Sequence, residues 1–325
     1  MAGFDCEVKE RRLEILEQSL GCHIMRYMHD DNVTEVLVNP DGKLWIDTFD
    51  HGFENTGIVM NPDAVKRVIY AVADLSGQVI DLRSDPSLQA DIPPSRLFSN
   101  CRFQAELPTI VTGPSFNIRK HSKTVFTLDD YVAQGTMTAG QKEAILTAIH
   151  GKKNIIAAGG TASGKSTLLN AILAEISTLG ERIITIEDTK ELKCTAENCV
   201  ALTTTDHVDM DSLLRKTLRL SPNRIVVGEV RSREALTLID AWSTGHRGGC
   251  STVHSDSAHE TLYRLEGMIS RVSLNPQQAA IARAINVIVY IAKRSAHRRV
   301  EEVLAVDRWD SAAGDYITHR MDVSS

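Results

Sequence analysis

The sequence lacks an apolar run long enough to cross a membrane. The apolar stretch at residues 285–292 contains Asn286 and is far shorter than the ~20 residues that a spanning helix needs. The N-terminal residues 1–7 are polar and acidic, which matches neither a secretory signal peptide nor a myristoylation signal. We therefore expect any membrane contact to be peripheral.

Cysteine is scarce and scattered. Of the six cysteines, only Cys194 and Cys199 lie close together, and no second pair stands at the spacing of a zinc finger. Disulfide frameworks belong to oxidising compartments, and this scattered pattern is not such a framework. We therefore expect free thiols in a reducing cytoplasm.

An excess of positive charge is also missing. The net charge is −6 at pH 7, so the chain has no electrostatic footprint for nucleic acid. The basic clusters are short, as at residues 293–294 and 297–299, and we interpret them as a solvated face. Sequence-specific binding of nucleic acid is therefore not expected.

The length of 325 residues and the hydrophobic fraction of 42% are enough for two domains with cores of their own. Residues 5–29 have the apolar spacing of an amphipathic helix, and residues 32–47 alternate as a β-hairpin around a Pro-Asp-Gly turn. A helix is predicted to begin at Pro62, and short strands are predicted between residues 85 and 112. These patterns predict a small α+β domain with an antiparallel sheet.

The rest of the chain alternates between strand and helix. The pattern predicts a first domain at residues 1–121, a linker at 122–138 and an α/β nucleotide-binding domain with a largely parallel sheet at 139–325. The predicted strands of this last domain are residues 154–158, 182–187, 224–230, 249–254 and 286–292, and its predicted helices are 141–150, 166–176, 210–220, 232–242, 258–269 and 276–284.

Residues 159–166 match the phosphate-binding pattern G-x-x-x-x-G-K-[ST]. Lys165 would reach the β- and γ-phosphates, and the Ser166 hydroxyl would bind Mg²⁺. The predicted strand before the motif and the predicted helix after it argue against a glycine turn that merely caps a helix. The residues predicted to bind ATP here are Gly160, Thr161, Ala162, Ser163, Gly164, Lys165, Ser166 and Thr167.

Two predicted strands end in carboxylates, Glu187 and Glu229. Ligands of open α/β sheets bind outside the carboxyl ends of the strands, so both side chains should lie at the edge that carries the phosphate loop. Hydrolysis of ATP needs a carboxylate that orients or deprotonates a water molecule. Both glutamates are candidates for that base, and the residues alone do not decide between them.

Residues 245–254 hold two histidines, His246 and His254, together with three glycines. A neutral imidazole here would donate to a γ-phosphate or bridge it to a neighbouring subunit, and the alternative is a tight glycine turn with one core histidine. Zinc is disfavoured because no further Cys or His pair supplies ligands. Arg102 and Arg119 are candidates for sensing phosphate, since a guanidinium makes bidentate bonds to it.

Four motifs together resemble the boxes of the traffic ATPases of type II and type IV secretion systems, and in particular the TrbB-like conjugal transfer ATPases. The P-loop, Asp, Walker B and His boxes correspond to residues 159–167, 184–192, 220–231 and 245–254, and residues 35–47 and 113–120 agree in the N-terminal half. The resemblance implies a PAS-like N-terminal domain, a RecA-like P-loop C-terminal domain and ATP bound between them. It also implies a cytoplasmic homohexamer, peripheral at the inner membrane, that hydrolyses ATP with Mg²⁺ and works with secretion or mating-pair components.

The resemblance also assigns roles to residues. Glu187 would polarise the attacking water, His254 would sense the γ-phosphate, and Ser166 and Glu229 would hold the metal. The residues that it implies for catalysis are Lys165, Glu187, Glu229 and His254.

Arg102 and Arg119, by the same resemblance, would close the N-terminal domain onto the nucleotide. The chain departs from the family pattern at Gly228, where Asp usually precedes the Walker B glutamate, and at Asn223, where Asp is common. It also lacks the four-cysteine metal module of many type II secretion and pilus-extension ATPases, which disfavours those relatives.

Three other functions stay open as alternatives. A pilus or type II secretion motor is disfavoured by the chain length and the missing cysteine module. A nucleotide-gated scaffold that barely turns over is disfavoured by the presence of both Glu187 and Glu229. A DNA translocase is disfavoured by the acidic net charge.

Overall fold

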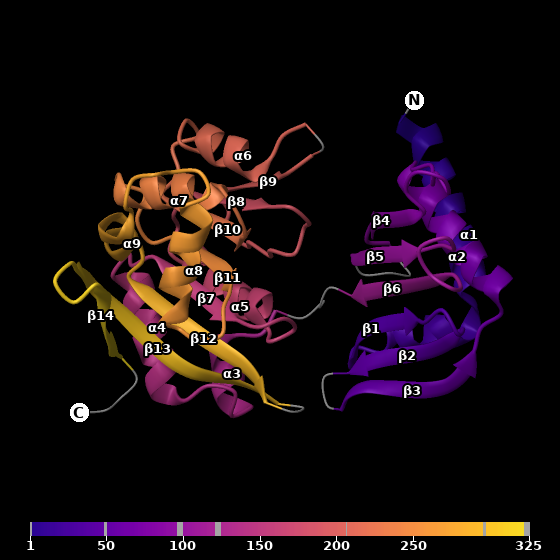
Figure 1. The fold of residues 1–325 in the computed structure, drawn as a ribbon, viewed down its shortest axis with the longest axis horizontal. Helices are drawn as coiled ribbons and strands as arrows, with labels where there is room; N and C mark the ends of the chain where they lie inside the picture. Colours follow the sequence, from indigo (N-terminus) through magenta and orange to yellow (C-terminus); the bar gives the residue numbers. More distant parts are fainter. Residues whose placement is uncertain are drawn as a thin grey trace. The chain divides into compact units, whose positions relative to one another are not determined.

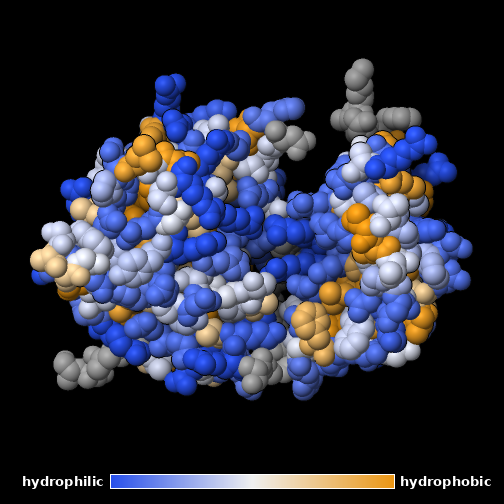
Figure 2. Space-filling model, in the orientation of Figure 1, coloured by the Kyte–Doolittle hydropathy of each residue, from blue (hydrophilic) through white to orange (hydrophobic). Residues whose placement is uncertain are grey.

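The computed structural model describes residues 2–48, 51–95, 100–120, 125–205, 207–294 and 297–321, and for residues 2–6 it describes the backbone alone. The chain divides into two compact units, Met1–Lys123 and Thr124–Ser325 (Figure 1). Among the described residues, no helix combines the length and the apolar character that a membrane span requires. Hydrophilic side chains cover most of the face shown in Figure 2, and hydrophobic ones form small separate patches on it.

The first unit is an α+β domain, as the sequence predicts. Its elements are helices α1 (Ala2–His29) and α2 (Pro62–Ser76) and strands β1 (Val33–Val38), β2 (Lys43–Thr48), β3 (Gly52–Val59), β4 (Ser87–Ile92), β5 (Cys101–Glu106) and β6 (Ser115–Lys120). The strands form an antiparallel sheet in the order β3-β2-β1-β6-β5-β4, and both helices contribute apolar side chains to one core with it.

Helix α1 carries the apolar stripe that the sequence predicts. Leu13, Leu16, Leu20 and Ile24 are all buried, which follows from their i, i+3 and i+4 spacing. The helix is kinked at Gly21, whose φ of 69° lies outside the helical region. Glycine tolerates this conformation because it has no Cβ.

The boundaries of α2 follow from its flanking residues. The side chain of Asn61 accepts a hydrogen bond from the Asp63 amide, and Pro62 occupies the first turn. Gly77, with a φ of 69°, ends the helix in the left-handed conformation.

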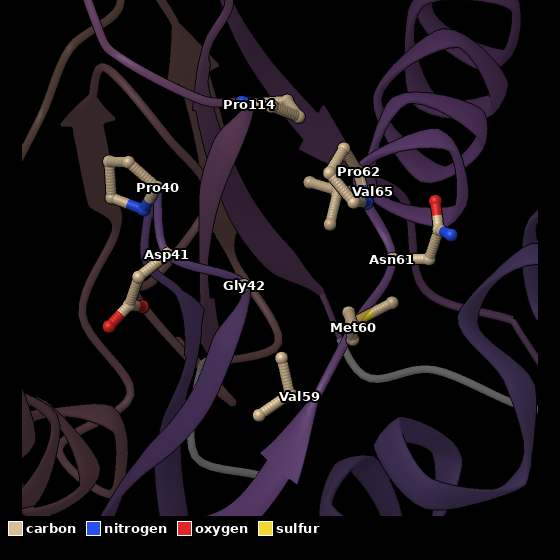
Figure 3. A pocket seen from close by; sticks show the side chains of 9 residues that line it. All are labelled: Pro40, Asp41, Gly42, Val59, Met60, Asn61, Pro62, Val65 and Pro114. Atoms are coloured by element: carbon tan, nitrogen blue, oxygen red, sulfur yellow. The ribbon is translucent and has the colours of Figure 1, made fainter.

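A pocket of about 380 Å³ lies in the first unit, where the β1–β2 turn meets the junction of β3 and α2 (Figure 3). The Asp41 carboxylate on its rim is paired with Lys43, at 2.9 Å from the ammonium. The rest of the lining consists mainly of proline and aliphatic side chains. Neither arginine predicted to sense phosphate lines it. The lining residues are Pro40, Asp41, Gly42, Val59, Met60, Asn61, Pro62, Val65 and Pro114.

The second unit is built on an eight-stranded, largely parallel sheet in the order β14-β13-β12-β7-β11-β10-β8-β9 (Figure 1). The antiparallel pairs among its described strands are β12 with β13 and β13 with β14. The strands are β7 (Ile155–Gly159), β8 (Ile183–Glu187), β9 (Cys199–Thr203), β10 (Arg224–Val230), β11 (Cys250–His254), β12 (Val287–Arg294), β13 (His297–Asp310) and β14 (Asp315–Arg320). The helices are α3 (Leu128–Ala133), α4 (Ala139–His150), α5 (Lys165–Ser177), α6 (Met210–Thr217), α7 (Glu234–Ser243), α8 (Glu260–Ile269) and α9 (Gln278–Ala284).

Helices cover both faces of this sheet. Successive residues of β7 belong to different cores: Ile155 packs with residues of α3, α4 and α5, whereas Ile156 packs with residues of α6 to α9. Strand side chains alternate between faces, and a sheet covered on both faces needs apolar residues at every position. This explains why the strands read as short continuous apolar runs.

Part of the segment at 122–138 that the sequence predicts as a linker is folded into the second unit. Residues 122–124 lie outside the described residues. Helix α3 begins with a capping box formed by Thr127 and Asp130, and its Leu128 and Tyr131 are buried among residues of α4 and α5. The six residues of α3 are too few, and too few of them are apolar, for the sequence to predict a helix here.

Candidate functional site

The phosphate-binding motif forms the loop between β7 and α5. Ala162 has a φ of 56° and Gly164 a φ of 96°, so left-handed residues stand on either side of Ser163. Such an alternation of left-handed and right-handed residues is typical of backbone concavities whose N–H groups bind anions. Gly159 must lack a side chain, because a Cβ there would lie 2.2 Å from the carbonyl oxygen of Ile291 in the neighbouring strand β12.

Lys165 is the first residue of α5 and is 7% exposed. Its ammonium donates to the Gly160 carbonyl oxygen at 2.7 Å and lies 3.2 Å from Nδ1 of His254. The Ser163 hydroxyl is buried and has no hydrogen-bond partner among the described residues. A buried hydroxyl of this kind, beside an anion-binding loop, fits a phosphate oxygen as its partner.

The other predicted residues of the motif differ in exposure. Ser166 and Thr167 are half-buried in the first turn of α5, and Thr161 is exposed at the outside of the loop. The hydroxyl-bearing residues therefore follow directly after the anion-binding turn, at the N-terminus of a helix whose dipole favours anions.

The position of β11 between β7 and β10 brings the predicted histidine and one glutamate to the loop. His254, the last residue of β11, pairs with Gly159 of β7. Its Nε2 lies 3.1 Å from Oε1 of Glu229 near the end of β10, and Oε2 of Glu229 accepts from Nη2 of Arg231 at 2.6 Å. Lys165, His254 and Glu229 thus form one contiguous set, which we call the catalytic-edge set.

Glu187 ends β8 and is 4% exposed. Its Oε2 accepts hydrogen bonds from the backbone N–H groups of Glu191 at 2.7 Å and Leu192 at 2.8 Å. Burial raises the pKa of the Glu187 carboxyl to about 7, although these two bonds lower it. A carboxylate with such a pKa suits proton transfer near neutral pH.

Glycine at position 228 has a packing reason in this structure. A Cβ at this position would lie 3.1 Å from the Cβ of Glu187, which is closer than ordinary van der Waals contact. The strands β10 and β8 run side by side here, with Val227 paired to Ile186. Glycine therefore makes room for Glu187 where a larger residue would crowd it.

Asn170 is a residue of the site that the sequence analysis missed. It lies in α5 and is 8% exposed; its Nδ2 donates to the Glu191 carbonyl oxygen at 3.0 Å, and its Oδ1 accepts from the Lys193 amide at 2.8 Å. These bonds fasten the loop after Glu187 to the helix after the phosphate loop. A single amide on the apolar face of the predicted helix was the signal in the sequence.

The glycine turn before β11 has a structural reason. Asn154 is buried and its Oδ1 accepts from the amides of Gly248 at 2.7 Å and Gly249 at 3.1 Å. A Cβ on Gly249 would lie 2.3 Å from the carbonyl oxygen of Ile225. His246 lies in the same turn, with Nδ1 3.4 Å from the Pro222 carbonyl oxygen, so the two predicted histidines have separate surroundings.

A pocket of about 320 Å³ lies beside the catalytic-edge set. Arg231 joins the two, because its Nη2 binds Glu229 while its Nη1 lies 3.3 Å from Oδ2 of Asp188 in the pocket wall. None of the phosphate-loop residues lines this pocket. Its lining residues are Asp188, Thr204, Thr205, Asp209, Met210, Asp211, Arg231, Ser232, Arg233 and Glu234.

Arg102 and Arg119 lie in the first unit, directly opposite each other on β5 and β6. Their side chains therefore share one face of the sheet. Glu35 stands opposite Arg119 on one side and Asp91 opposite Arg102 on the other, and Nε of Arg119 lies 3.6 Å from Oε1 of Glu35. The two acids offset the repulsion that adjacent like charges cause in a sheet.

Comparisons with known proteins agree with the motifs. Residues 22–312 match the type II/IV secretion system protein family. The chain belongs to this family. The conjugal transfer protein TrbB of Rhizobium radiobacter is 43% identical over 300 residues, covering 91% of this chain and 91% of that protein. A probable conjugal transfer protein TrbB of Sinorhizobium fredii is 42% identical over 301 residues, covering 92% of this chain and 91% of that protein. The resemblance that the motifs indicate is confirmed.

Solved structures share the fold. The chain is similar to the ATPase DotB of Legionella pneumophila, with a TM-score of 0.63 and 19% identity over 92% of this chain and 79% of that one. It is also similar to the pilus retraction motor PilT with bound ADP, with a TM-score of 0.62 and 18% identity over 92% of this chain and 81% of that one. The predicted fold class, a RecA-like α/β domain after an α+β domain, is confirmed.

Proposed function

We propose that this chain is a Mg²⁺-dependent ATPase that powers a step of conjugative transfer or of another type IV secretion process. The observation that carries the proposal is the catalytic-edge set, in which His254 stands between the Lys165 ammonium at 3.2 Å and the Glu229 carboxylate at 3.1 Å. The relatives at 43% and 42% identity are named for conjugal transfer, which supports the process.

ATP would bind through its phosphates. The N–H groups of the loop and the Lys165 ammonium bind the β- and γ-phosphate oxygens, for which Lys165 exchanges its present bond to the Gly160 carbonyl. The N-terminus of α5 adds the positive end of its dipole. The Ser163 hydroxyl gains a phosphate oxygen as its partner.

The donor chemistry at the motif fits Mg²⁺, which prefers oxygen ligands and keeps waters and substrate phosphates around it. The Ser166 hydroxyl and the Glu229 carboxylate are such donors. When bound, the metal would neutralise charge on the phosphates. Removal of divalent cations should therefore stop turnover.

Hydrolysis requires a water molecule in line with the scissile bond. A bond forms between the water oxygen and the γ-phosphorus while the bond to the bridging oxygen of ADP breaks, and the water proton passes to a carboxylate. Glu187, with its pKa near 7, is the proposed acceptor. The Glu229 carboxylate would help to hold the metal ion, and His254 donates to the γ-phosphate.

The assembly belongs to the same proposal. We propose a homohexameric ring in the cytoplasm, peripheral at the inner membrane, that works with secretion or mating-pair components. Arg102 and Arg119 would close the first unit onto the nucleotide, which explains two guanidinium groups placed side by side on one face of that sheet.

Two measurements test the proposal: the rate of phosphate release and the native mass. Both are made with and without Mg²⁺ on the wild type, Lys165→Ala and Glu229→Gln. We expect Mg²⁺-dependent turnover by an oligomer of about six subunits, and no turnover in either variant. Glu229→Gln should still bind ATP, whereas Lys165→Ala should not. A wild type that binds no ATP would overturn the ATPase proposal, and an active monomer would overturn the ring.

A nucleotide-gated scaffold is the second candidate. One observation favours it: the two backbone bonds hold Oε2 of Glu187 in its own loop, which occupies one of the two oxygens that could act on water. Single-turnover hydrolysis by wild type and Glu187→Gln separates the two functions. Equal rates in both would remove Glu187 from catalysis, and tight ATP binding without hydrolysis would favour the scaffold.

A further inference from the structure

Arg298 reaches the phosphate-binding loop from the C-terminal hairpin. Strand β12 pairs with β7, and β13 returns beside β12. From β13, Nε of Arg298 donates to the carbonyl oxygen of Ala162 at 3.3 Å. Its side chain is half-buried, whereas the neighbouring His297 and Arg299 are exposed. The interpretation of residues 297–299 as a solvated face is therefore wrong for Arg298.

Arg298 contacts both left-handed residues of the loop. Besides its bond to Ala162, it packs against Gly164, where a Cβ would lie 3.1 Å from Cδ of Arg298. The φ angles of these two residues are 56° and 96°. One side chain thus covers the segment in which the backbone alternates to form the anion-binding turn.

These contacts have a physical consequence for the loop. A residue with a Cβ is unfavourable in the left-handed region and stays there only where its surroundings hold it. In an anion-binding turn the N–H groups face the anion, so the carbonyl groups need other donors. Arg298 supplies a charged donor to Ala162, and charge-assisted bonds are the stronger ones.

We propose that Arg298 is a positioning residue that holds the loop in its phosphate-binding conformation and so sets the affinity for nucleoside diphosphates and triphosphates. The inference rests on the proposed function, since it concerns the same nucleotide site. The contacts of Arg298 with the loop are at Ala162 and Gly164, and the glutamates proposed to act on water belong to β8 and β10. Its loss should therefore weaken ADP and ATP binding alike and leave the hydrolytic step nearly unchanged.

Four full-length proteins test this inference: wild type, Arg298→Gln, Arg298→Lys and, as a matched control on the same strand, Arg299→Gln. Titration with a fluorescent ADP analogue and a fluorescent ATP analogue gives the two dissociation constants, and steady-state kinetics give KM and kcat. Thermal unfolding of each variant shows whether the fold is kept.

We expect Arg298→Gln to raise both dissociation constants and KM by about tenfold or more, in line with the loss of one charge-assisted hydrogen bond, and to leave kcat within about twofold. Arg298→Lys should recover part of the affinity because it keeps a cationic donor. Arg299→Gln should match the wild type.

Several results would overturn the inference while the wild type still binds nucleotide. These are unchanged affinity in Arg298→Gln, a fall in kcat without a rise in KM, an equal effect in Arg299→Gln, or an Arg298→Gln protein that does not fold. Absence of nucleotide binding in the wild type would instead overturn the proposed function.

Discussion

His254 lies between the Lys165 ammonium and the Glu229 carboxylate, with Nδ1 3.2 Å from the nitrogen of Lys165 and Nε2 3.1 Å from Oε1 of Glu229. A neutral imidazole has one acceptor and one donor nitrogen. The lysine can only donate, so in the neutral ring Nδ1 accepts from it and the proton stands on Nε2. This N–H is the group that we propose donates to the γ-phosphate.

Removal of the imidazole should slow hydrolysis more than it weakens ATP binding. We expect His254→Ala to lower kcat by roughly 10²-fold, because it removes a donor proposed to act on the γ-phosphate, and to change KM little. His246→Ala is the matched control, since its ring lies beside the Pro222 carbonyl. Equal losses in the two variants would show a general effect of the glycine turn instead.

The burial of Glu187 should make stability depend on pH. Because burial raises its pKa to about 7 from the usual 4.5, the folded state favours the protonated carboxyl. The protonated Glu187 carboxyl therefore stabilises the folded state. This contribution to the free energy of unfolding is fully present below the usual pKa and is lost as pH rises through about 7. Glu187→Gln does not titrate, so its free energy of unfolding relative to wild type should rise across this window and then level off.

Urea unfolding of wild type and Glu187→Gln at several pH values between about 5 and about 8 measures this difference. Glu197→Gln is the control, because Glu197 is exposed in the same loop. Parallel curves for wild type and Glu187→Gln would contradict the raised pKa.

Arg224 should matter for stability and not for chemistry. Its side chain is 1% exposed; it pairs with Glu181 and donates to the carbonyl oxygens of Gly248 at 2.9 Å and Ile149 at 3.1 Å. Arg224→Met breaks a buried pair and removes donors from two buried carbonyls, and should cost about 3 kcal/mol of unfolding free energy.

Chemical unfolding of Arg215→Met provides the comparison for Arg224→Met. The Arg215 side chain is 70% exposed and pairs with Asp211 one helical turn away, so its loss should cost below about 0.5 kcal/mol. Equal costs for both variants would contradict the structural role of Arg224.

Closure of the first unit on the nucleotide can be tested at Arg119. If its guanidinium binds a phosphate, Arg119→Ala should weaken ATP binding by about tenfold or more. Arg12→Ala is a control from the same unit, where Arg12 pairs with Asp74 between the two helices at 3.1 Å. Unchanged ATP affinity in Arg119→Ala would count against closure.

The sequence predicted those parts of the site whose residues are contiguous in the chain. Lys165 and Ser166 belong to one short motif, and the strand that ends at Glu187 is mainly isoleucine, so local patterns were enough to place these residues at the start of a helix and the end of a strand. The fold class followed from the alternation of such runs with amphipathic helices.

The parts that the sequence did not predict depend on contacts between distant residues. Arg298 and Ala162 are 136 positions apart, and the amide of Asn170 holds the Glu191 carbonyl 21 positions away. The bonds that Glu187 accepts from Glu191 and Leu192 are local in sequence. They depend on a loop conformation that no recognisable turn motif in the sequence predicts. Roles of this kind become visible only when the strands are in register.

The place of β7 in its sheet has a consequence for synthesis. Its two neighbours are β11 and β12, and Ile155 pairs with Cys250 on one side and Val287 on the other. A ribosome that adds roughly 5–20 residues per second therefore leaves this buried, apolar strand without its partners for several seconds. During that interval the backbone N–H and C=O groups on both edges of β7 are unpaired. The contacts that His254 and Arg298 make at the phosphate loop form only once residues of the last quarter of the chain have been synthesised.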